Sequence, residues 1–248
     1  MPILLITATV TPPPAATKLG RIDPKARLAD YEDALAFYLD RLADGVFDSI
    51  VFVENSASDV DSLKALVIRA GLTERVEFVS FYGLDYPSEY GRAYGEMRLI
   101  DHAMAVSTKI GAAALDEMVW KVTGRYVVLN VGALVRVEPG SVFCCHCRDF
   151  PRRWADMYLM GWAKDAYEWM LGGAADRIRE SHERPVSSEV EFRRLVDDRA
   201  ASGKVVRRFA QAPLIRGVRG FDNKRYEEDR VKSVARGVLA KIAPWIWI

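Results

Sequence analysis

The sequence predicts an α/β fold in which a mostly parallel sheet is flanked by helices. A continuous apolar, β-rich run at residues 2–10 is typical of a central strand that is buried on both faces. Strand-like and helix-like segments then alternate over the first 110 residues, as they do in βαβ units. Half of the 248 residues are apolar and 28% are charged, so the chain can bury a core and is not globally disordered.

Local patterns predict the individual elements in order. The first strand ends at Thr11-Pro12-Pro13-Pro14, because consecutive prolines cannot donate to a sheet ladder. Ser58 or Asp59 is expected to cap a helix that runs to about residue 70. Further strands are predicted at 48–53, 76–81, 118–129 (one or two strands around Gly124), 141–147 and 157–162, and further helices at 24–43, 93–106 and 174–201.

Several classes of protein are excluded by what the sequence lacks. The formal net charge is +1, so the chain does not bind nucleic acid by bulk charge. It has no Walker loop, no GxGxxG after the first strand and no GxSxG elbow. These absences weigh against a P-loop NTPase, an ordinary NAD enzyme and an α/β-hydrolase. The loop of three prolines also differs from the glycine-rich first loop of a methyltransferase.

Cysteine usage and hydropathy predict a cytoplasmic protein. Cys144, Cys145 and Cys147 are too close together to staple a fold, which favours a reducing compartment. A metal knuckle that includes His146 would need a second ligand pair, so we interpret these cysteines as small apolar strand residues. No run of about 20 apolar residues is present, and the apolar start lacks the basic leader of a signal peptide.

Four segments together resemble a known family. These are ILLITATVTP at the start, IVFVENSASD after the second strand, YGRAYGEMRLID before the third helix, and WKVTGRYVVLN. They resemble small bacterial glycosyltransferases of surface-polysaccharide (O-antigen and capsule) pathways, over about residues 3–135 with an echo at 216–226. The resemblance implies a GT-A-like Rossmann-type domain and a nucleotide-sugar donor. We expect this domain to span 1–203, followed by a basic C-terminal region at 204–248.

The ligand crevice of such a sheet lies beyond the carboxyl ends of its strands. Family members usually carry a DxD motif and a divalent cation where the fourth main strand ends, but here Lys121-Val122-Thr123-Gly124-Arg125-Tyr126 occupies that place. Alternation in an extended segment puts Lys121, Thr123 and Arg125 on one face, where the two cations could neutralise a phosphate. The alternative is a strand pair with exposed basic residues. The only DxD, at 59–61, starts a helix after the second strand, so we expect no metal cofactor.

Other segments complete the expected donor site. Gly91 and Gly95 leave backbone accessible at a helix start that favours anions, and Arg92 adds a cation. Glu96 could bind a sugar hydroxyl or act as a base. Further donor contacts are expected from Thr9, Asn55, Ser56, Gly124, Tyr126, Arg216 and Arg219, the last two in a loop that would cover the phosphates.

Several questions stay open at this point. If the anomeric centre inverts, the general base is one of Glu96, Asp116, Glu117 and Glu189. The rival interpretations are a sugar nucleotidyltransferase and a non-catalytic Rossmann-like partner subunit. The sugar, the nucleotide, the acceptor and the stereochemical outcome are not predicted.

The C-terminal region carries a charge asymmetry. Residues 204–248 hold eleven Lys or Arg and four Asp or Glu, a charge of +7, whereas residues 1–203 carry −6. The apolar positions of 231–242 recur at helical spacing, and the chain ends in Trp245-Ile246-Trp247-Ile248. This segment is either a helix docked on the domain or one that lies at the inner face of the plasma membrane, which would suit a lipid-linked acceptor.

Overall fold

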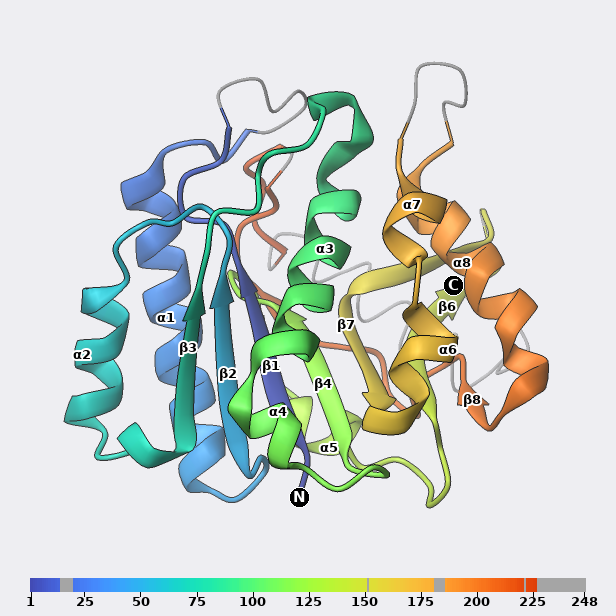
Figure 1. Ribbon diagram of the computed structural model, residues 1–248, viewed down its shortest axis with the longest axis horizontal. Helices are drawn as coiled ribbons and strands as arrows, with labels where there is room; N and C mark the ends of the chain where they lie inside the picture. The colour runs from blue at the N-terminus through green and yellow to red at the C-terminus, as the bar shows by residue number, and fades with distance from the viewer. Residues whose placement is uncertain (14–19, 151, 181–185, 221, 227–248) are drawn as a thin grey trace.

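The computed structural model describes residues 1–13, 20–150, 152–180, 186–220 and 222–226, and it confirms the α/β fold (Figure 1). The strands of the main sheet are β1 (Ile3–Ala8), β2 (Ser49–Glu54), β3 (Val76–Ser80), β4 (Met118–Thr123), β6 (Phe143–Arg148), β7 (Trp154–Ala163) and β8 (Val205–Val206); β5 (Val127–Val128) pairs separately with β9 (Ile215–Arg216). The helices are α1 (Pro24–Ala43), α2 (Asp61–Arg69), α3 (Gly91–Val106), α4 (Thr108–Ala112), α5 (Val131–Leu134), α6 (Tyr167–Leu171), α7 (Ala174–Ile178) and α8 (Ser188–Arg199).

The order of strands in the main sheet is β3-β2-β1-β4-β7-β6-β8. Strands β1 to β4 are parallel, while β7 runs antiparallel to both β4 and β6. The carboxyl ends of β1 to β4 therefore meet at one edge, the upper edge in Figure 1, which we call the carboxyl edge. Register places Thr7 of β1 beside Thr123 of β4 at this edge.

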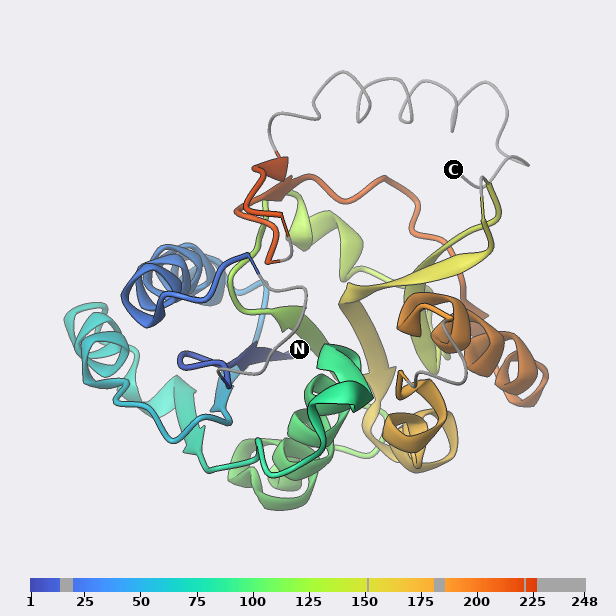
Figure 2. The ribbon, with the colours of Figure 1, turned by 90° about the horizontal axis from the view of Figure 1, so that it is seen from above.

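Helices cover both faces of the sheet, and each face has its own core. Leu4 and Ile6 of β1 point toward α1 and α2, whereas Ile3 and Leu5 point toward α3. Figure 2 shows α1 and α2 on one side of the sheet and α3 on the other. We call these the α1 face and the α3 face; α6, α7 and α8 add their apolar residues to the α3 face. The strand at the start of the chain is thus buried on both faces, as its continuous apolar run predicts.

Several element boundaries differ from those predicted. Val60, not Ser58 or Asp59, is the N-cap of α2 and makes no side-chain cap. Ser58 belongs to the loop before α2, where its backbone N–H donates a hydrogen bond to Glu54 Oε2 at 3.1 Å. Helix α3 begins at Gly91, two residues early, and the predicted helix at 174–201 is divided into α7 and α8. The segment at 118–129 forms two strands, and the second leaves the main sheet after the turn at Gly124.

Two expectations from composition can be compared with the structure. The three cysteines are free and buried on β6, as small apolar strand residues, with Cys145 Sγ 3.6 Å from Cys147 Sγ. Within the described residues, no helix combines the length and the apolar character that crossing a membrane requires. The predicted C-terminal helix and its tryptophans fall at 227–248, outside the described residues.

Candidate active site at the carboxyl edge

A carboxylate held by three donors lies at the centre of the carboxyl edge. Glu96 stands in the second turn of α3, and its Oε1 accepts hydrogen bonds from Thr7 Oγ1 and Thr123 Oγ1, each at 3.0 Å. The Lys121 ammonium lies 2.5 Å from the same oxygen. Thr7 and Thr123 lie 89 and 27 residues from Glu96 in the sequence, and both contact the same carboxylate oxygen. Glu96 Oε2 forms no hydrogen bond with any described residue and remains available to a ligand.

Lys121 is buried behind this carboxylate. Its side chain has no exposed surface, and Nζ donates to Thr123 Oγ1 at 3.0 Å and to the Met157 carbonyl at 2.6 Å. With Glu96 these acceptors use all three N–H groups of the ammonium. The structure therefore places Lys121 where it holds Glu96, with no surface of its own exposed at the carboxyl edge.

The environment of Glu96 favours its ionised form. Burial alone raises the pKa of a carboxylic acid, but the Lys121 ammonium and the two threonine hydroxyls lower the pKa of Glu96 by more, so the net shift is downward. The carboxylate is therefore charged throughout the neutral pH range. About a fifth of the side chain, 22%, is exposed, so the charge faces the edge of the sheet.

Glycines at the start of α3 allow close contacts. Gly91 has a φ of 80°, a backbone conformation that residues other than glycine rarely adopt. A Cβ at position 95 would lie 1.9 Å from the hydroxyl of Tyr86, so Gly95 is what lets this tyrosine lie against the helix. Burial raises the pKa of Tyr86, and Tyr94 and Glu96 raise it further. Sequence reasoning did not single out Tyr86.

Arg125 does not share the face of Lys121 and Thr123, because the turn at Gly124 breaks the alternation of the strand. Its Nη1 donates to the Val218 carbonyl at 3.1 Å. A Cβ at position 220 would lie 2.6 Å from Arg125 Nη2 and 3.5 Å from Arg92 Nη1, so both guanidinium groups lie close to Gly220. The turn requires glycine at position 124, since a Cβ there would lie 2.7 Å from the Thr7 carbonyl oxygen.

A second polar network joins the loops that follow β1 and β2. Glu54 is fully buried, and it accepts hydrogen bonds from the backbone N–H groups of Val10, Ser56 and Ser58 and from the Ser56 hydroxyl. Thr9 Oγ1 lies 2.6 Å from Asn55 Oδ1. The structure thus brings together Thr9, Asn55 and Ser56. Glu54 lies just past the strand predicted at 48–53, but the sequence does not indicate that it organises these loops.

Gly220, in the described part of the segment after β9, lies against the residues before α1. The Gly220 carbonyl accepts from the backbone N–H groups of Gly20 and Arg21, at 2.9 and 3.1 Å. The two arginines expected to contact phosphates have acidic neighbours: Arg216 pairs with Asp33 at 3.0 Å, and Arg219 pairs with Asp222 at 3.3 Å. The Tyr126 ring packs edge-on against Tyr226, with centroids 5.1 Å apart.

Two buried groups beside this loop were not anticipated. Arg27 Nε donates to the Thr9 carbonyl at 2.7 Å, and Tyr31 Oη accepts from the Thr9 N–H at 2.9 Å. Their spacing of four residues on α1 is a helical face. Nothing in the sequence distinguishes these polar groups from others on a helix surface.

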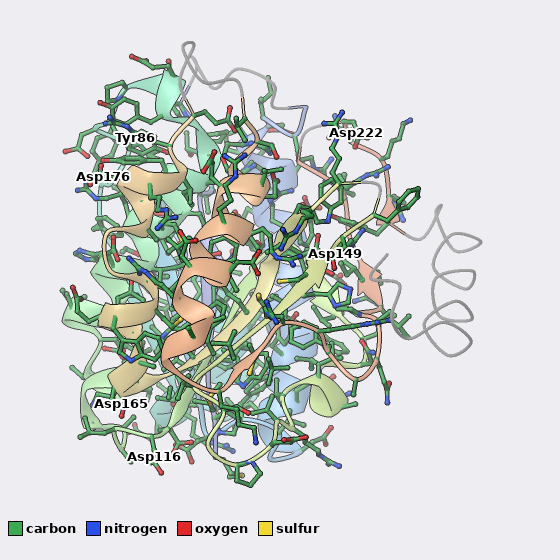
Figure 3. All side chains as sticks on the ribbon, turned by 90° about the vertical axis from the view of Figure 1, so that its right-hand side faces the viewer. Tyr86, Asp116, Asp149, Asp165, Asp176 and Asp222 are labelled. Carbon is green, nitrogen blue, oxygen red and sulfur yellow. The ribbon has the colours of Figure 1, made fainter. Side chains whose placement is uncertain are left out.

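Two of the remaining candidate bases lie away from Glu96. Asp116 and Glu117 precede β4 and so lie at the opposite edge of the sheet, one strand length of about 20 Å away. Figure 3 labels Asp116 and Tyr86 at opposite ends of the molecule. Glu117 pairs with the amino group of Met1 at 3.1 Å. Glu189 is exposed in the first turn of α8, and Asp61 of the DxD segment pairs with Lys64 at 2.8 Å.

The fold and these contacts define an α/β protein with a polar, partly open site at the carboxyl edge of a parallel sheet. No family model and no curated protein matches the chain. The solved structures that resemble it include a protein described as a nucleotide-diphospho-sugar transferase from Desulfovibrio desulfuricans G20, at 16% identity and a TM-score of 0.47, which covers 83% of this chain and 78% of that one.

Two further structures are similar at the same level. The glycosyltransferase GlyE of Streptococcus pneumoniae TIGR4 has 10% identity and a TM-score of 0.47, over 83% of this chain and 44% of that one. A 4-diphosphocytidyl-2C-methyl-D-erythritol synthase has 11% identity and a TM-score of 0.42, over 94% of this chain and 96% of that one. At these identities and scores, the likenesses assign no activity to this chain.

Proposed function

We propose that this chain is a glycosyltransferase that moves a sugar from a nucleotide-activated donor to a glycan or lipid-linked acceptor. The observation that carries the proposal is that an ionised carboxylate, Glu96, and two guanidinium groups, Arg92 and Arg125, occur in the segments along the carboxyl edge. Sugar transfer needs a group that accepts a proton and cations that neutralise the departing phosphate. Both kinds of group lie within the segments that bound one edge of the sheet.

The cations suit a diphosphate leaving group. Arg92 is exposed and makes no hydrogen bond or ion pair with another described residue, so its guanidinium is available to an anion. Arg125 is buried, with 7% of its surface exposed, and its Nε has no hydrogen-bond partner among the described residues. A planar guanidinium can bind two phosphate oxygens at once, and a buried one holds its geometry. In this proposal Lys121 acts through Glu96, which it positions.

Glu96 is assigned as the general base. Its Oε2 takes the proton of the acceptor hydroxyl as the acceptor oxygen forms a bond to the anomeric carbon of the donor sugar. The bond from that carbon to the phosphate oxygen breaks, and its electron pair leaves with the nucleotide. The sugar is therefore expected to transfer with inversion, because one displacement occurs at the anomeric carbon. The Lys121 ammonium keeps the carboxylate ionised and in place.

The nucleoside is assigned to the loops joined by Glu54. Asn55 has only 2% exposure and its Oδ1 is occupied by Thr9, so its amide is held in one orientation. Tyr82 pairs with Ser56 through an isolated β-bridge and is 65% exposed. An exposed aromatic ring beside fixed hydrogen-bonding groups is suited to stack on a base.

Calorimetric titration with UDP, GDP, CMP and dTDP tests the proposal directly. One nucleotide is expected to bind more tightly than the other three, because the amide of Asn55 is fixed before binding. Slow hydrolysis of the matching nucleotide sugar separates a transferase from a non-catalytic subunit. If none of the four nucleotides binds, the proposal is wrong.

Loss of Arg92 is expected to weaken donor binding without affecting folding. Because the side chain is exposed and has no described partner, Arg92→Gln should raise the Kd of the nucleotide about tenfold, which is the effect of losing one charge-assisted hydrogen bond. Arg125→Ala should have at least as large an effect, and its unfolding is measured in parallel since the residue is buried. The matched control is Arg69→Gln, an exposed arginine on α2. Equal nucleotide affinity in wild type and Arg92→Gln would remove Arg92 from the donor site.

Transfer activity is expected to survive EDTA. The cationic residues Lys121 and Arg125 lie at the end of β4, where a DxD motif is usual. The DxD segment of this chain lies at the start of α2, where Asp59 Oδ1 accepts a hydrogen bond from the Asp61 N–H at 2.8 Å. Turnover is measured before and after chelation, and again after Mg²⁺ or Mn²⁺ is added back. A complete loss in chelator that is restored by either metal would contradict this prediction.

A further inference from the structure

A cavity of about 490 Å³ lies between the start of β7 and α8. Its lining holds four arginines, one aspartate and one valine, namely Arg152, Arg153, Arg193, Arg194, Asp197 and Val190. Val190, Arg193, Arg194 and Asp197 belong to α8. They are spaced as i, i+3, i+4 and i+7, so they form one face of that helix. None of the residues assigned above to the donor or to the base lines this cavity.

Two of the arginines are held in fixed positions by carboxylates. Arg193 is only 3% exposed; its Nε lies 3.0 and 2.9 Å from the two Asp197 oxygens, and its Nη1 lies 2.9 Å from Asp149 Oδ1. Arg153 Nη2 donates to Asp197 Oδ2 at 2.8 Å. Asp149 is labelled in Figure 3. The cavity wall is therefore organised before any ligand enters.

Arginines outnumber carboxylates among the described residues that line the cavity. Arg207 also pairs with Asp197, at 3.2 Å, and Arg194 pairs with Glu191 at 2.5 Å. Arg152 is exposed and makes no hydrogen bond or ion pair with another described residue. Of the described residues that line the cavity, four are arginines and one is an aspartate.

Strand β7 relates the cavity to the candidate base. Its Met157 carbonyl accepts from Lys121, which orients Glu96. Arg153 lies four residues earlier, a separation of about 13 Å along an extended chain. Met157 and the apolar residues of α8 belong to the same core as Tyr94 and Met97 of α3, so both sites lie on the α3 face.

We propose that this cavity binds a phosphate group and, resting on the proposed function, that this phosphate belongs to the acceptor substrate. A phosphate monoester carries a charge of about −1.5 to −2 at neutral pH, which suits a wall in which arginines outnumber the one aspartate. Guanidinium groups also match the oxygens of phosphate geometrically.

The test measures phosphate binding in the Arg92→Gln background, where the donor site is expected to be weakened about tenfold. Inorganic phosphate and glucose 1-phosphate are titrated calorimetrically into the full chain at low salt. Adding Arg152→Gln and Arg194→Gln, both exposed positions, is expected to weaken binding at least about tenfold. Arg136→Gln, an exposed arginine after α5, is the matched control and should leave binding unchanged. Arg153 and Arg193 are kept, because they join α8 to β7.

Three results would overturn the proposal: no phosphate binding in the Arg92→Gln chain, equal binding after the two added substitutions, or acetate binding as tightly as phosphate. A sugar phosphate and a lipid phosphate are distinguished by repeating the comparison with vesicles of phosphatidylcholine with and without phosphatidic acid. Loss of vesicle binding in the variant identifies a lipid source, and loss of glucose 1-phosphate binding identifies a soluble one.

Nucleotide titrations of the chain that retains Arg92 separate this proposal from the proposed function. If the four nucleotides fail to bind while phosphate binding still depends on Arg152 and Arg194, the transferase assignment fails and the phosphate site stands. If a nucleotide binds but phosphate does not, the reverse holds.

Discussion

A Glu96→Gln variant should transfer sugar about a thousandfold more slowly than the wild-type chain, within the range for loss of a general base. The amide keeps the size of the carboxylate but cannot accept the proton of the acceptor hydroxyl. Nucleotide affinity should change little, because Arg92 and Arg125 hold the phosphates in this proposal. The measurement is single-turnover transfer at saturating donor, with nucleotide binding determined by calorimetry.

Glu189→Gln provides the control for Glu96. It removes the same charge from an exposed position in the first turn of α8 and should leave turnover at the wild-type level. A Glu96→Gln chain that folds, binds nucleotide and transfers at near wild-type rate would refute the assignment of the base. Retention of configuration in the product would refute the single-displacement mechanism.

Replacing Lys121 by Met should lower the free energy of unfolding by about 3–5 kcal/mol, the usual cost of breaking a buried ion pair. The substitution leaves the Glu96 carboxylate with its principal partner missing and leaves the Met157 carbonyl without its donor. The double variant Lys121→Met with Glu96→Gln should recover part of this loss, because no unpaired charge remains. It should nevertheless be inactive, since it has no base.

Lys64→Met is the comparison for a solvent-exposed pair. Lys64 is 50% exposed and lies 2.8 Å from Asp61, so its removal should leave the unfolding midpoint unchanged within error. Urea denaturation of the single and double variants provides the free energies. Equal stability of Lys121→Met and the wild-type chain would show that the buried pair does not support the fold.

The pH dependence of stability gives an independent measure of the same pair. The pKa of Glu96 is below its ordinary value of 4.5 in the folded protein, so its ionisation stabilises the fold at pH values above 4.5. This contribution is lost as the pH falls through the folded pKa. The stability difference between wild type and Glu96→Gln should therefore shrink on acidification below about pH 4.5, and not on raising the pH toward neutrality.

The sequence predicted the layout of the sheet better than the contacts of its edge. Period and composition located β1, β2, β3 and α1, because those elements bury continuous or regularly spaced apolar residues. Alternation also placed Lys121 and Thr123 together on one face. It failed at Arg125, since Gly124 turns the chain before that residue.

The polar network of the edge depends on which loops meet, and local pattern does not contain that information. Glu54 follows the strand predicted at 48–53, yet it is fully buried and accepts a hydrogen bond from Val10 in the loop after β1. Tyr86 lies against Gly95 because a loop of the chain returns to the start of α3. Such contacts join residues that are distant in sequence, so a single sequence gives no signal for them.

The Glu54 network also bears on how selectively a nucleoside can be bound. Four hydrogen bonds to one buried carboxylate already restrict the loops after β1 and β2. Loops that are ordered in the free protein have little conformational entropy left to lose when a ligand binds. Discrimination between bases at this rim would then come from direct fit to a rigid surface, and a wrong base would meet a misfit that the loops cannot relax to accommodate.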